Sequence, residues 1–177
     1  MGAKGGITVP TRERSCCFTG HRPEKLPWGM NEQDPRCVAL KQKICDAVTT
    51  AYEEGMRHFI CGMARGCDFY FAEAVLALRE THPDVTLEAA IPCPGQADRW
   101  SQANRERWRR LVAACDLETV VQQEYTPWCM IRRNHYMVDH SALVIAIYDG
   151  TNGGTRRTLE YALKQKVSFL DITPEYE

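Results

Sequence analysis

The sequence lacks the features that mark a membrane protein or a generally basic nucleic-acid-binding protein. No apolar run in its 177 residues approaches the roughly 20 residues needed to span a bilayer, and no signal peptide opens the chain. Lys and Arg total 22 against 23 Asp and Glu, which gives a net charge of −1. Any contact with nucleic acid or an anionic membrane would therefore require a local basic patch. We expect a cytoplasmic protein with no membrane partner.

Metal-site and disulfide signatures are also missing. The nine cysteines are an odd number, and none of them forms a CxxC pair. His135 and His140 are five residues apart, whereas a helical pair of metal ligands is spaced by four. Several cysteines lie in apolar, strand-like runs, where a free thiol behaves as a small hydrophobic side chain. The sequence predicts reduced, buried cysteines, without a metal site and without a metal or redox cofactor.

What the chain does contain is a regular alternation of short apolar runs and helical patterns. This alternation predicts crossover units and a mostly parallel sheet covered on both faces. The run "LVIAIY" is apolar on both sides of the pleat, as a central parallel strand should be. We predict a flexible leader over 1–14 and a single doubly wound α/β domain over 15–177. The predicted strands lie in 15–20, 57–62, 86–92, 117–122, 142–150 and 167–172, and the predicted helices in 36–54, 69–81, 99–114, 128–140 and 155–166.

The loops that follow the strands are the places to look for a ligand site. In an open parallel sheet, ligands bind outside the carboxyl ends of the strands, where the N-termini of helices also point. Backbone N–H groups and the helix dipole favour an anion at such a place. Each loop also has a plainer explanation, a tight turn that needs glycine, with any arginine pairing to an acidic neighbour. Neither GxGxxG nor GxxxxGK[ST] is present. The four loops read "TGHRPEKL", "CGMARGCD", "IPCPGQADRW" and "YDGTNGGTRRTLE".

Three segments, "GHRP", "CGMARGCD" and "YDGTNGGT", resemble the SLOG superfamily in their order and spacing. More narrowly, the chain from about Ser15 to Ile172 resembles the YpsA-like branch of bacterial proteins. The resemblance implies a Rossmann-like fold with a nucleotide-sized pocket at the strand ends, commonly assembled as a homo-oligomer. "GMARG-D" also resembles the loop of DprA, a single-stranded DNA-binding member. "MIRRNHYMVDHSALVIAIYDG" resembles a segment of LOG enzymes, which hydrolyse nucleoside monophosphates at the N-glycosidic bond.

The resemblance to LOG enzymes defines an alternative, catalytic function. In those enzymes an arginine before the central strand and a glutamate just after the glycine-rich turn carry the chemistry. Arg133 falls at the arginine position, but an arginine and a threonine stand where the glutamate is expected. The nearest carboxylate, Glu160, lies more than one turn into the helix and on a different face. Glu160 has the spacing to pair with Arg156 or Lys164 instead. Arg133 and Glu160 are the candidate catalytic residues of this alternative.

The second alternative is DprA-like binding of single-stranded DNA. The segment "RWSQANRERWRRL" mixes arginines with Trp100 and Trp108, and arginine with aromatic stacking is one way in which single strands are held. Trp100, Trp108 and Leu111 also fall near one helical stripe, a pattern typical of core contacts with the arginines in solvent. The nearly neutral chain disfavours nucleic acid as a partner.

We therefore predict a domain that binds a nucleotide or nucleotide-derived ligand, as a sensor or processing module. The segment 62–66 would cradle phosphate, with Arg65 supplying charge and Asp68 holding the loop or a ribose hydroxyl. Gln96 and Trp100 are candidates to close the pocket over a base, with core packing as the alternative for Trp100. The predicted ligand-binding residues are Gly20, His21, Arg22, Gly62, Met63, Ala64, Arg65, Gly66, Asp68, Asn134, Asp149, Gly150, Gly153, Gly154 and Thr155.

Overall fold

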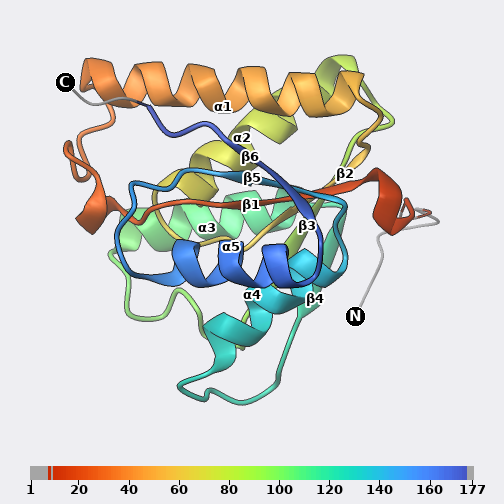
Figure 1. Cartoon of the computed structure of the whole chain (residues 1–177). Coiled ribbons are helices and arrows are strands. Elements are labelled where there is room, and N and C mark those ends of the chain that lie inside the picture. Colours follow the sequence, from red (N-terminus) through yellow and green to blue (C-terminus); the bar gives the residue numbers. More distant parts are fainter. Residues whose placement is uncertain (1–7, 9, 175–177) are drawn as a thin grey trace.

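A sheet of six parallel strands forms the centre of the protein (Figure 1). The computed structural model describes residue 8 and residues 10–174; most of the predicted leader, 1–7 and 9, lies outside the described residues. The strand order is β4-β3-β2-β1-β5-β6, and every neighbouring pair is parallel. This arrangement confirms the predicted α/β fold, with the sheet entirely rather than mostly parallel. The strands are β1 (Ser15–Thr19), β2 (His58–Cys61), β3 (Thr86–Ile91), β4 (Leu117–Val120), β5 (Leu143–Ala146) and β6 (Ser168–Asp171).

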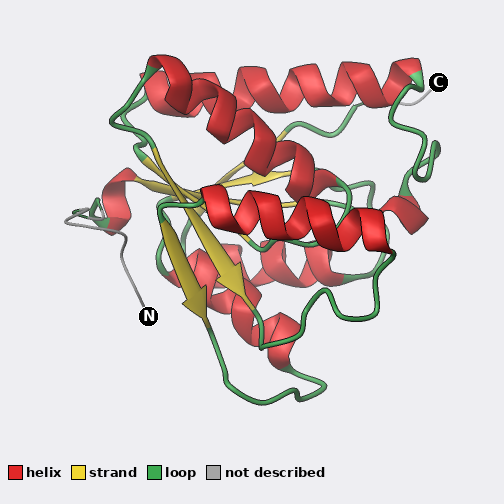
Figure 2. Cartoon of the chain, turned by 180° about the vertical axis from the view of Figure 1, so that it is seen from behind, coloured by secondary structure: helices red, strands yellow, loops and turns green. Residues whose placement is uncertain are grey.

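Helices cover both faces of the sheet, as a doubly wound fold requires. Residues of α1, α2 and α3 pack in one buried cluster, whereas residues of α4 and α5 pack in a second cluster across the sheet. Figures 1 and 2 show α1 on one side of the strands and α4 with α5 on the other. In the described part of the chain, no helix is both long and apolar enough to cross a bilayer. The helices are α1 (Pro35–Glu53), α2 (Cys67–Thr81), α3 (Gln102–Ala114), α4 (Cys129–Asp139) and α5 (Gly154–Lys164).

Capping residues set the helix starts where these differ from the sequence prediction. The side chain of Ser101 accepts a hydrogen bond from the backbone N–H of Asn104, so α3 begins at Gln102 and not at 99. Gly66 has a φ of 84°, a left-handed conformation suited to glycine, and α2 begins directly after it. Lys166 also has a positive φ, 58°, and lies beyond the end of α5. Helical periodicity thus locates the helices, while local cap chemistry fixes their ends.

The core on the α1–α3 face is rich in aromatic side chains. Phe18 of β1 stacks on Phe71 of α2, with ring centroids 4.7 Å apart. Trp100 and Trp108 pack against the same cluster, as the stripe on α3 predicts. Full burial of one such large apolar side chain stabilises a fold by about 1.5–3 kcal/mol. Trp100 and Trp108 are partly buried against this core, and Trp100 also lines a small cavity together with Arg22, Arg65 and Gln96.

The cysteines give a simple test of this core. All nine are free thiols, and all but Cys45 are buried. Burial raises the pKa of the Cys16 and Cys61 thiols well above the ordinary value, which suppresses the reactive thiolate. We expect a thiol reagent at neutral pH to label the native protein slowly and at Cys45 first, and to label every cysteine after unfolding in urea. Rapid labelling of several thiols in the native protein, counted by mass spectrometry, would contradict this packing.

Candidate functional site

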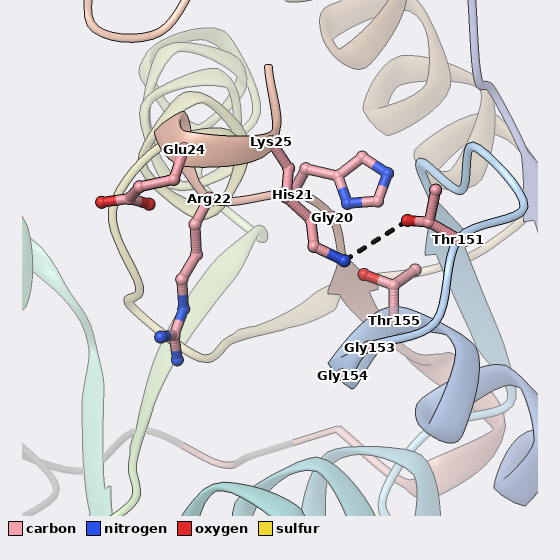
Figure 3. A pocket seen from close by; sticks show the side chains of 9 residues that line it. All are labelled: Gly20, His21, Arg22, Glu24, Lys25, Thr151, Gly153, Gly154 and Thr155. Atoms are coloured by element: carbon pink, nitrogen blue, oxygen red, sulfur yellow. Dashed lines mark hydrogen bonds between the residues drawn. The ribbon is translucent and has the colours of Figure 1, made fainter.

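The candidate site lies at the carboxyl ends of β1 and β5, where the strand order reverses. From β1 the chain crosses to β2 on one side of the sheet, whereas β5 pairs with β1 on the other side. Ligands of open parallel sheets bind at such a switch point. The loops after both strands line one cavity of about 360 Å³ (Figure 3). Its lining residues are Gly20, His21, Arg22, Glu24, Lys25, Thr151, Gly153, Gly154 and Thr155.

Smaller cavities adjoin this main cavity and share lining residues with it. A cavity of about 100 Å³ lies between the main cavity and α4, and Asp68, Arg133 and Asn134 line it. A third, of about 160 Å³, lies between α4 and the start of α5, and its wall is largely apolar, with Pro127, Met130, Ile131 and His135. Gly154 lines all three cavities. The arrangement is a polar recess at the sheet switch point, with an apolar recess beside it.

The glycine-rich turn after β5 shapes one wall of the main cavity. Gly150 has a φ of 84°, which favours glycine. The backbone N–H and the hydroxyl of Thr151 both donate to Asp149 Oδ1, at 2.9 and 2.6 Å, and fold the turn on itself. Helix α5 then begins at Gly154, and its N-cap, Gly153, supplies no side-chain acceptor. The first N–H groups of α5 therefore begin beside the cavity without a side-chain cap.

Thr155 does not cap α5. Its buried hydroxyl instead accepts a hydrogen bond from the hydroxyl of Thr19, at 3.4 Å, and so links β1 to the start of α5. A side chain that holds two site elements together contributes to the shape of the cavity. It has less freedom to reach a ligand than an unpaired hydroxyl would have.

Positive charge dominates the main cavity. The exposed guanidinium of Arg22 has no hydrogen bond or ion pair with any residue that the structure describes. Lys25 donates to the carbonyl oxygen of Asn152 at 2.8 Å and to the Thr151 hydroxyl at 3.3 Å, both neutral groups. The only carboxylate in the lining, Glu24, pairs with Arg65 at 2.5 Å. The cavity thus has two cations whose charge its own carboxylate does not balance.

His21 connects the loop after β1 to the turn after β5. Its Nε2 lies 3.2 Å from Asp149 Oδ1 and accepts a hydrogen bond from the Asp149 backbone N–H at 3.3 Å. Burial lowers the pKa of His21 below the ordinary 6.5, and this outweighs the opposing effect of Asp149. The imidazole is therefore neutral at pH 7 and acts as a hydrogen-bond acceptor in the wall.

This burial predicts a pH dependence of stability. Between the lowered pKa of folded His21 and the ordinary value near 6.5, the unfolded chain binds more protons than the folded protein. The neutral His21 therefore favours the folded state fully above about pH 6.5. This contribution to the free energy of unfolding is lost as the pH falls through that window. We expect the free energy of unfolding, measured with urea, to fall less between about pH 7.5 and 5.5 in His21→Asn than in the wild type. If the free energy of unfolding changes equally with pH in the two proteins, His21 does not have a lowered pKa in the folded state.

The loop between β2 and α2 is held from inside the protein. The carbonyl oxygen of Gly62 accepts hydrogen bonds from the guanidinium of Arg133 and, at 3.0 Å, from Gln96 Nε2. A β-carbon on Gly62 would lie 2.8 Å from Arg133 Cζ, which explains the glycine at this position. Asp68 Oδ2 accepts the backbone N–H of Ala64 at 3.0 Å, so Asp68 holds the loop, one of its two predicted roles.

Arg133 and Asp68 are a buried charged pair beneath this loop. Arg133 is 4% exposed and Asp68 is 7% exposed. Burial raises the pKa of Asp68 and lowers that of Arg133, and each charge opposes the effect on the other. They form no direct ion pair in the described structure, and both line the cavity of about 100 Å³. Their charges set the field at the floor of the site.

Residues 16–173 match the family described as the YspA SLOG family. The chain belongs to this family. It is 30% identical over 145 residues to the SPbeta prophage-derived protein YoqJ of Bacillus subtilis, a match that covers 75% of this chain and 85% of YoqJ. It is 26% identical over 161 residues to a UPF0398 protein of Bacillus pumilus, with 89% and 84% covered.

A solved structure shares the fold of this YspA-family domain. The X-ray structure of DNA processing protein A (DprA) from Streptococcus pneumoniae aligns with a TM-score of 0.61 and 15% identity. The alignment covers 92% of this chain but only 51% of the DprA chain, so the domain spans about half the length of that protein. At this identity the likeness describes the fold alone.

Within the YspA-family domain, the predicted site residues fall into separate groups. The predicted residues of the first loop meet Gly153, Gly154 and Thr155 in the main cavity, whereas Asp149 and Gly150 do not line it. Asp68, Arg133 and Asn134 line the adjoining floor. Arg65 is tied to Glu24 and lies over the Trp100 ring, with Cζ 5.6 Å from the ring centroid. Glu160 lies exposed on α5, paired with Arg156 at 2.7 Å, and lines none of the cavities described above.

Sequence reasoning missed three residues of the main cavity, Glu24, Thr151 and Lys25, of which Lys25 alone is a cation. Lys25 stands in the quoted loop "TGHRPEKL", but without a structure it had no feature to separate it from a solvent-exposed lysine. The signal was its place, six residues after the end of β1 in a loop that reaches the sheet switch point. The structure describes no group of three or more His, Cys, Asp or Glu side chains arranged to hold a metal ion.

Proposed function

We propose that this YspA-family domain binds a phosphorylated nucleotide or nucleotide-derived ligand, with phosphate in the main cavity. The observation that carries the proposal is the unbalanced charge of Arg22 and Lys25 beside the uncapped start of α5. Charge-assisted hydrogen bonds to phosphate contribute on the order of 1.5–3 kcal/mol each. Helix N-termini add backbone N–H donors and a favourable dipole. An anionic ligand would supply the acceptors that the cavity lacks.

The apolar cavity between α4 and α5 supports a heterocyclic rather than a purely anionic ligand. It is about 160 Å³ in volume, and Met130 and Ile131 contribute apolar walls. This apolar cavity shares Gly154 with the main cavity. One ligand would therefore extend from one cavity into the other across a residue without a side chain. Sites of this kind combine apolar walls with a few fixed polar groups. A nucleotide has both parts.

A thermal-shift screen tests this function. The probes are adenosine, AMP, ADP, ADP-ribose, NAD, inorganic pyrophosphate and a thymidine oligonucleotide, followed by product analysis of any hit. A ligand that binds only the folded state raises stability by roughly 2.7 kcal/mol at a hundred times its Kd. We expect stabilisation by phosphorylated nucleotides and not by adenosine. Stabilisation by none of the phosphorylated probes would refute the proposal, and stabilisation by the oligonucleotide alone would favour single-stranded DNA binding.

Arg22→Ala sharpens the test. Because Arg22 has no partner among the described residues, its loss should leave the fold intact and remove one contact to phosphate. We expect ADP binding, measured by calorimetry, to weaken about 10- to 150-fold, which corresponds to 1.5–3 kcal/mol. The matched control is Arg109→Ala, an exposed arginine of α3 outside all the cavities described above. An equal loss of ADP affinity in both variants would mean that net charge matters and that Arg22 makes no specific contact with phosphate.

The LOG-like hydrolase remains the second candidate because Arg133 lies at the floor of the site. A general acid or base must lie within hydrogen-bond reach of its proton, and Glu160 is engaged with Arg156 on the outer surface of α5. We expect no release of free base from nucleoside monophosphates, and unchanged nucleotide affinity in Glu160→Gln. Rapid release by the wild type that is abolished in Glu160→Gln would establish the hydrolase instead.

A further inference from the structure

Lys25 joins the two loops that enclose the main cavity. It belongs to the short 3-10 helix η2 (Pro23–Lys25) after β1, and its side chain reaches across to the glycine-rich turn. Figure 3 shows the ammonium directed at Thr151, while the side chain of Arg22 extends toward a different part of the cavity. A lysine ammonium has three N–H donors, and the Thr151 hydroxyl and the Asn152 carbonyl accept two of them. One donor is left for a ligand.

The acceptors of Lys25 are both uncharged, which is unusual for a cation that holds two loops together. Among the described residues, no carboxylate lies within ion-pair distance of its ammonium. Asp149, the nearest acid of the turn, directs Oδ1 at Thr151 and lies beside His21. The ammonium of Lys25 is therefore positioned by two uncharged groups, and no carboxylate pairs with it directly. An anion in the cavity would meet a cation without a direct ionic partner.

Gly153 fits this ammonium closely. A β-carbon at Gly153 would lie 2.8 Å from Lys25 Nζ, and the next nearest atom, Lys25 Cε, would be 3.8 Å away. The backbone of Gly153 is extended, with a φ of 160°, a conformation open to other residues. Lys25 is thus the only neighbour within 4 Å that a side chain there would displace. A glycine at this position lets the ammonium keep its contacts with the turn.

We propose that Lys25 recognises the anionic group of the ligand and that Gly153 leaves room for its ammonium beside the turn. The inference rests on the proposed function. Lys25 would keep its contacts to the turn and direct its remaining donor at a phosphate oxygen beside Gly153. Ligands with a phosphate or diphosphate at this position would be selected over uncharged analogues. Lys25 and Gly153 then act as one unit, which predicts that their substitutions are not additive.

A double-mutant cycle tests this unit, with calorimetric titration of ADP and of inorganic pyrophosphate. We expect Lys25→Ala to weaken both about 10- to 150-fold, the effect of one charge-assisted hydrogen bond. Gly153→Ala should weaken them to a smaller extent in the wild-type background, because its methyl group shifts the ammonium without removing it. In the Lys25→Ala background the same change should have little further effect. Lys25→Arg, which keeps the charge, should restore part of the affinity.

Two controls separate recognition from a general loss of structure or charge. Lys43→Ala removes an exposed lysine of α1 outside the cavity and should leave both affinities unchanged. Urea unfolding of each variant shows whether it is folded. The salt dependence of ADP binding should be weaker in Lys25→Ala than in the wild type, because a charged contact is missing.

The outcomes distinguish this inference from the function on which it rests. Wild-type affinity for ADP and pyrophosphate in a folded Lys25→Ala variant overturns the role of Lys25 and leaves the proposed function standing. An equal effect of Gly153→Ala in both backgrounds overturns the coupling between the two residues. If neither probe binds the wild-type protein, the proposed function fails and the inference fails with it.

Discussion

Arg133→Met is expected to lower the free energy of unfolding by about 2–4 kcal/mol, because it removes a buried cation whose hydrogen-bond acceptors stay buried. The Arg133 guanidinium, buried under the loop after β2, donates to the carbonyl oxygens of Gly62 and Ala90, the latter at 3.4 Å. Methionine would keep much of the volume but would leave these acceptors and the Asp68 carboxylate without a cation. Urea denaturation monitored by circular dichroism measures the change.

The double variant identifies the source of this cost. Asp68→Asn removes the charge that Arg133→Met leaves uncompensated, so the combined loss should be smaller than the sum of the separate losses. Arg132→Ala, an exposed neighbour on α4, is the matched control and should change stability by about 0.5 kcal/mol or less. A loss below about 1 kcal/mol for Arg133→Met would mean that the site floor does not depend on this charge.

This result would also bear on the function. A residue that holds the Gly62 carbonyl in place acts on the ligand through the shape of the loop. Loss of binding in an Arg133 variant would then accompany loss of stability. A catalytic role would instead lower turnover in a variant that remains fully stable, and Arg133→Lys is the conservative change with which to look for it.

Periodicity in the sequence is enough to predict the sheet and the helices, because burial on both faces leaves a strong pattern in parallel strands. Strand ends were less well predicted. The apolar run over 142–150 suggested a longer strand, but β5 ends at Ala146. Beyond it Ile147 still donates its backbone N–H to the carbonyl oxygen of Thr19, at 3.0 Å, before the chain turns away. An apolar run in the sequence indicates which residues are buried, and Ile147 is buried although β5 has already ended.

The site was predictable only as far as topology determines it. Because parallel strands place their carboxyl ends at one edge, the loops around Gly20 and Gly154 had to meet. Which cation has a free donor was not predictable from spacing. Arg65 looked suited to a phosphate, yet it pairs with Glu24, while Lys25 faces the cavity. Such pairings depend on side-chain directions in irregular loops, where no helical or strand period applies.

The second large effect is expected at Glu88, outside the cavities but beneath the helix that carries Arg133. Glu88 is buried on β3, with Oε2 2.7 Å from His58 Nε2, and it accepts a hydrogen bond from the hydroxyl of Tyr136 at 2.6 Å. Glu88→Ala would leave the histidine ring and the tyrosine hydroxyl without this acceptor. We expect the free energy of unfolding to fall by about 2–4 kcal/mol, because two buried polar groups lose their charged hydrogen-bond partner.

Tyr136→Phe and a pH series show whether the carboxylate itself is responsible. Tyr136→Phe removes only one hydrogen bond to the carboxylate, a charge-assisted one, and should cost about 1.5–3 kcal/mol. Burial would raise the pKa of Glu88, but hydrogen bonds from His58 and Tyr136 outweigh it and hold the pKa below the ordinary 4.5. The stabilisation by Glu88 is therefore present above pH 4.5 and is lost as the pH falls through the lowered pKa. The stability difference between wild type and Glu88→Ala should shrink on acidification below that value. A difference that stays constant to low pH would assign the effect to packing, since an uncharged contact has no reason to titrate. Because Tyr136 lies on α4, loss of this contact should also loosen the helix that carries Arg133 to the site floor.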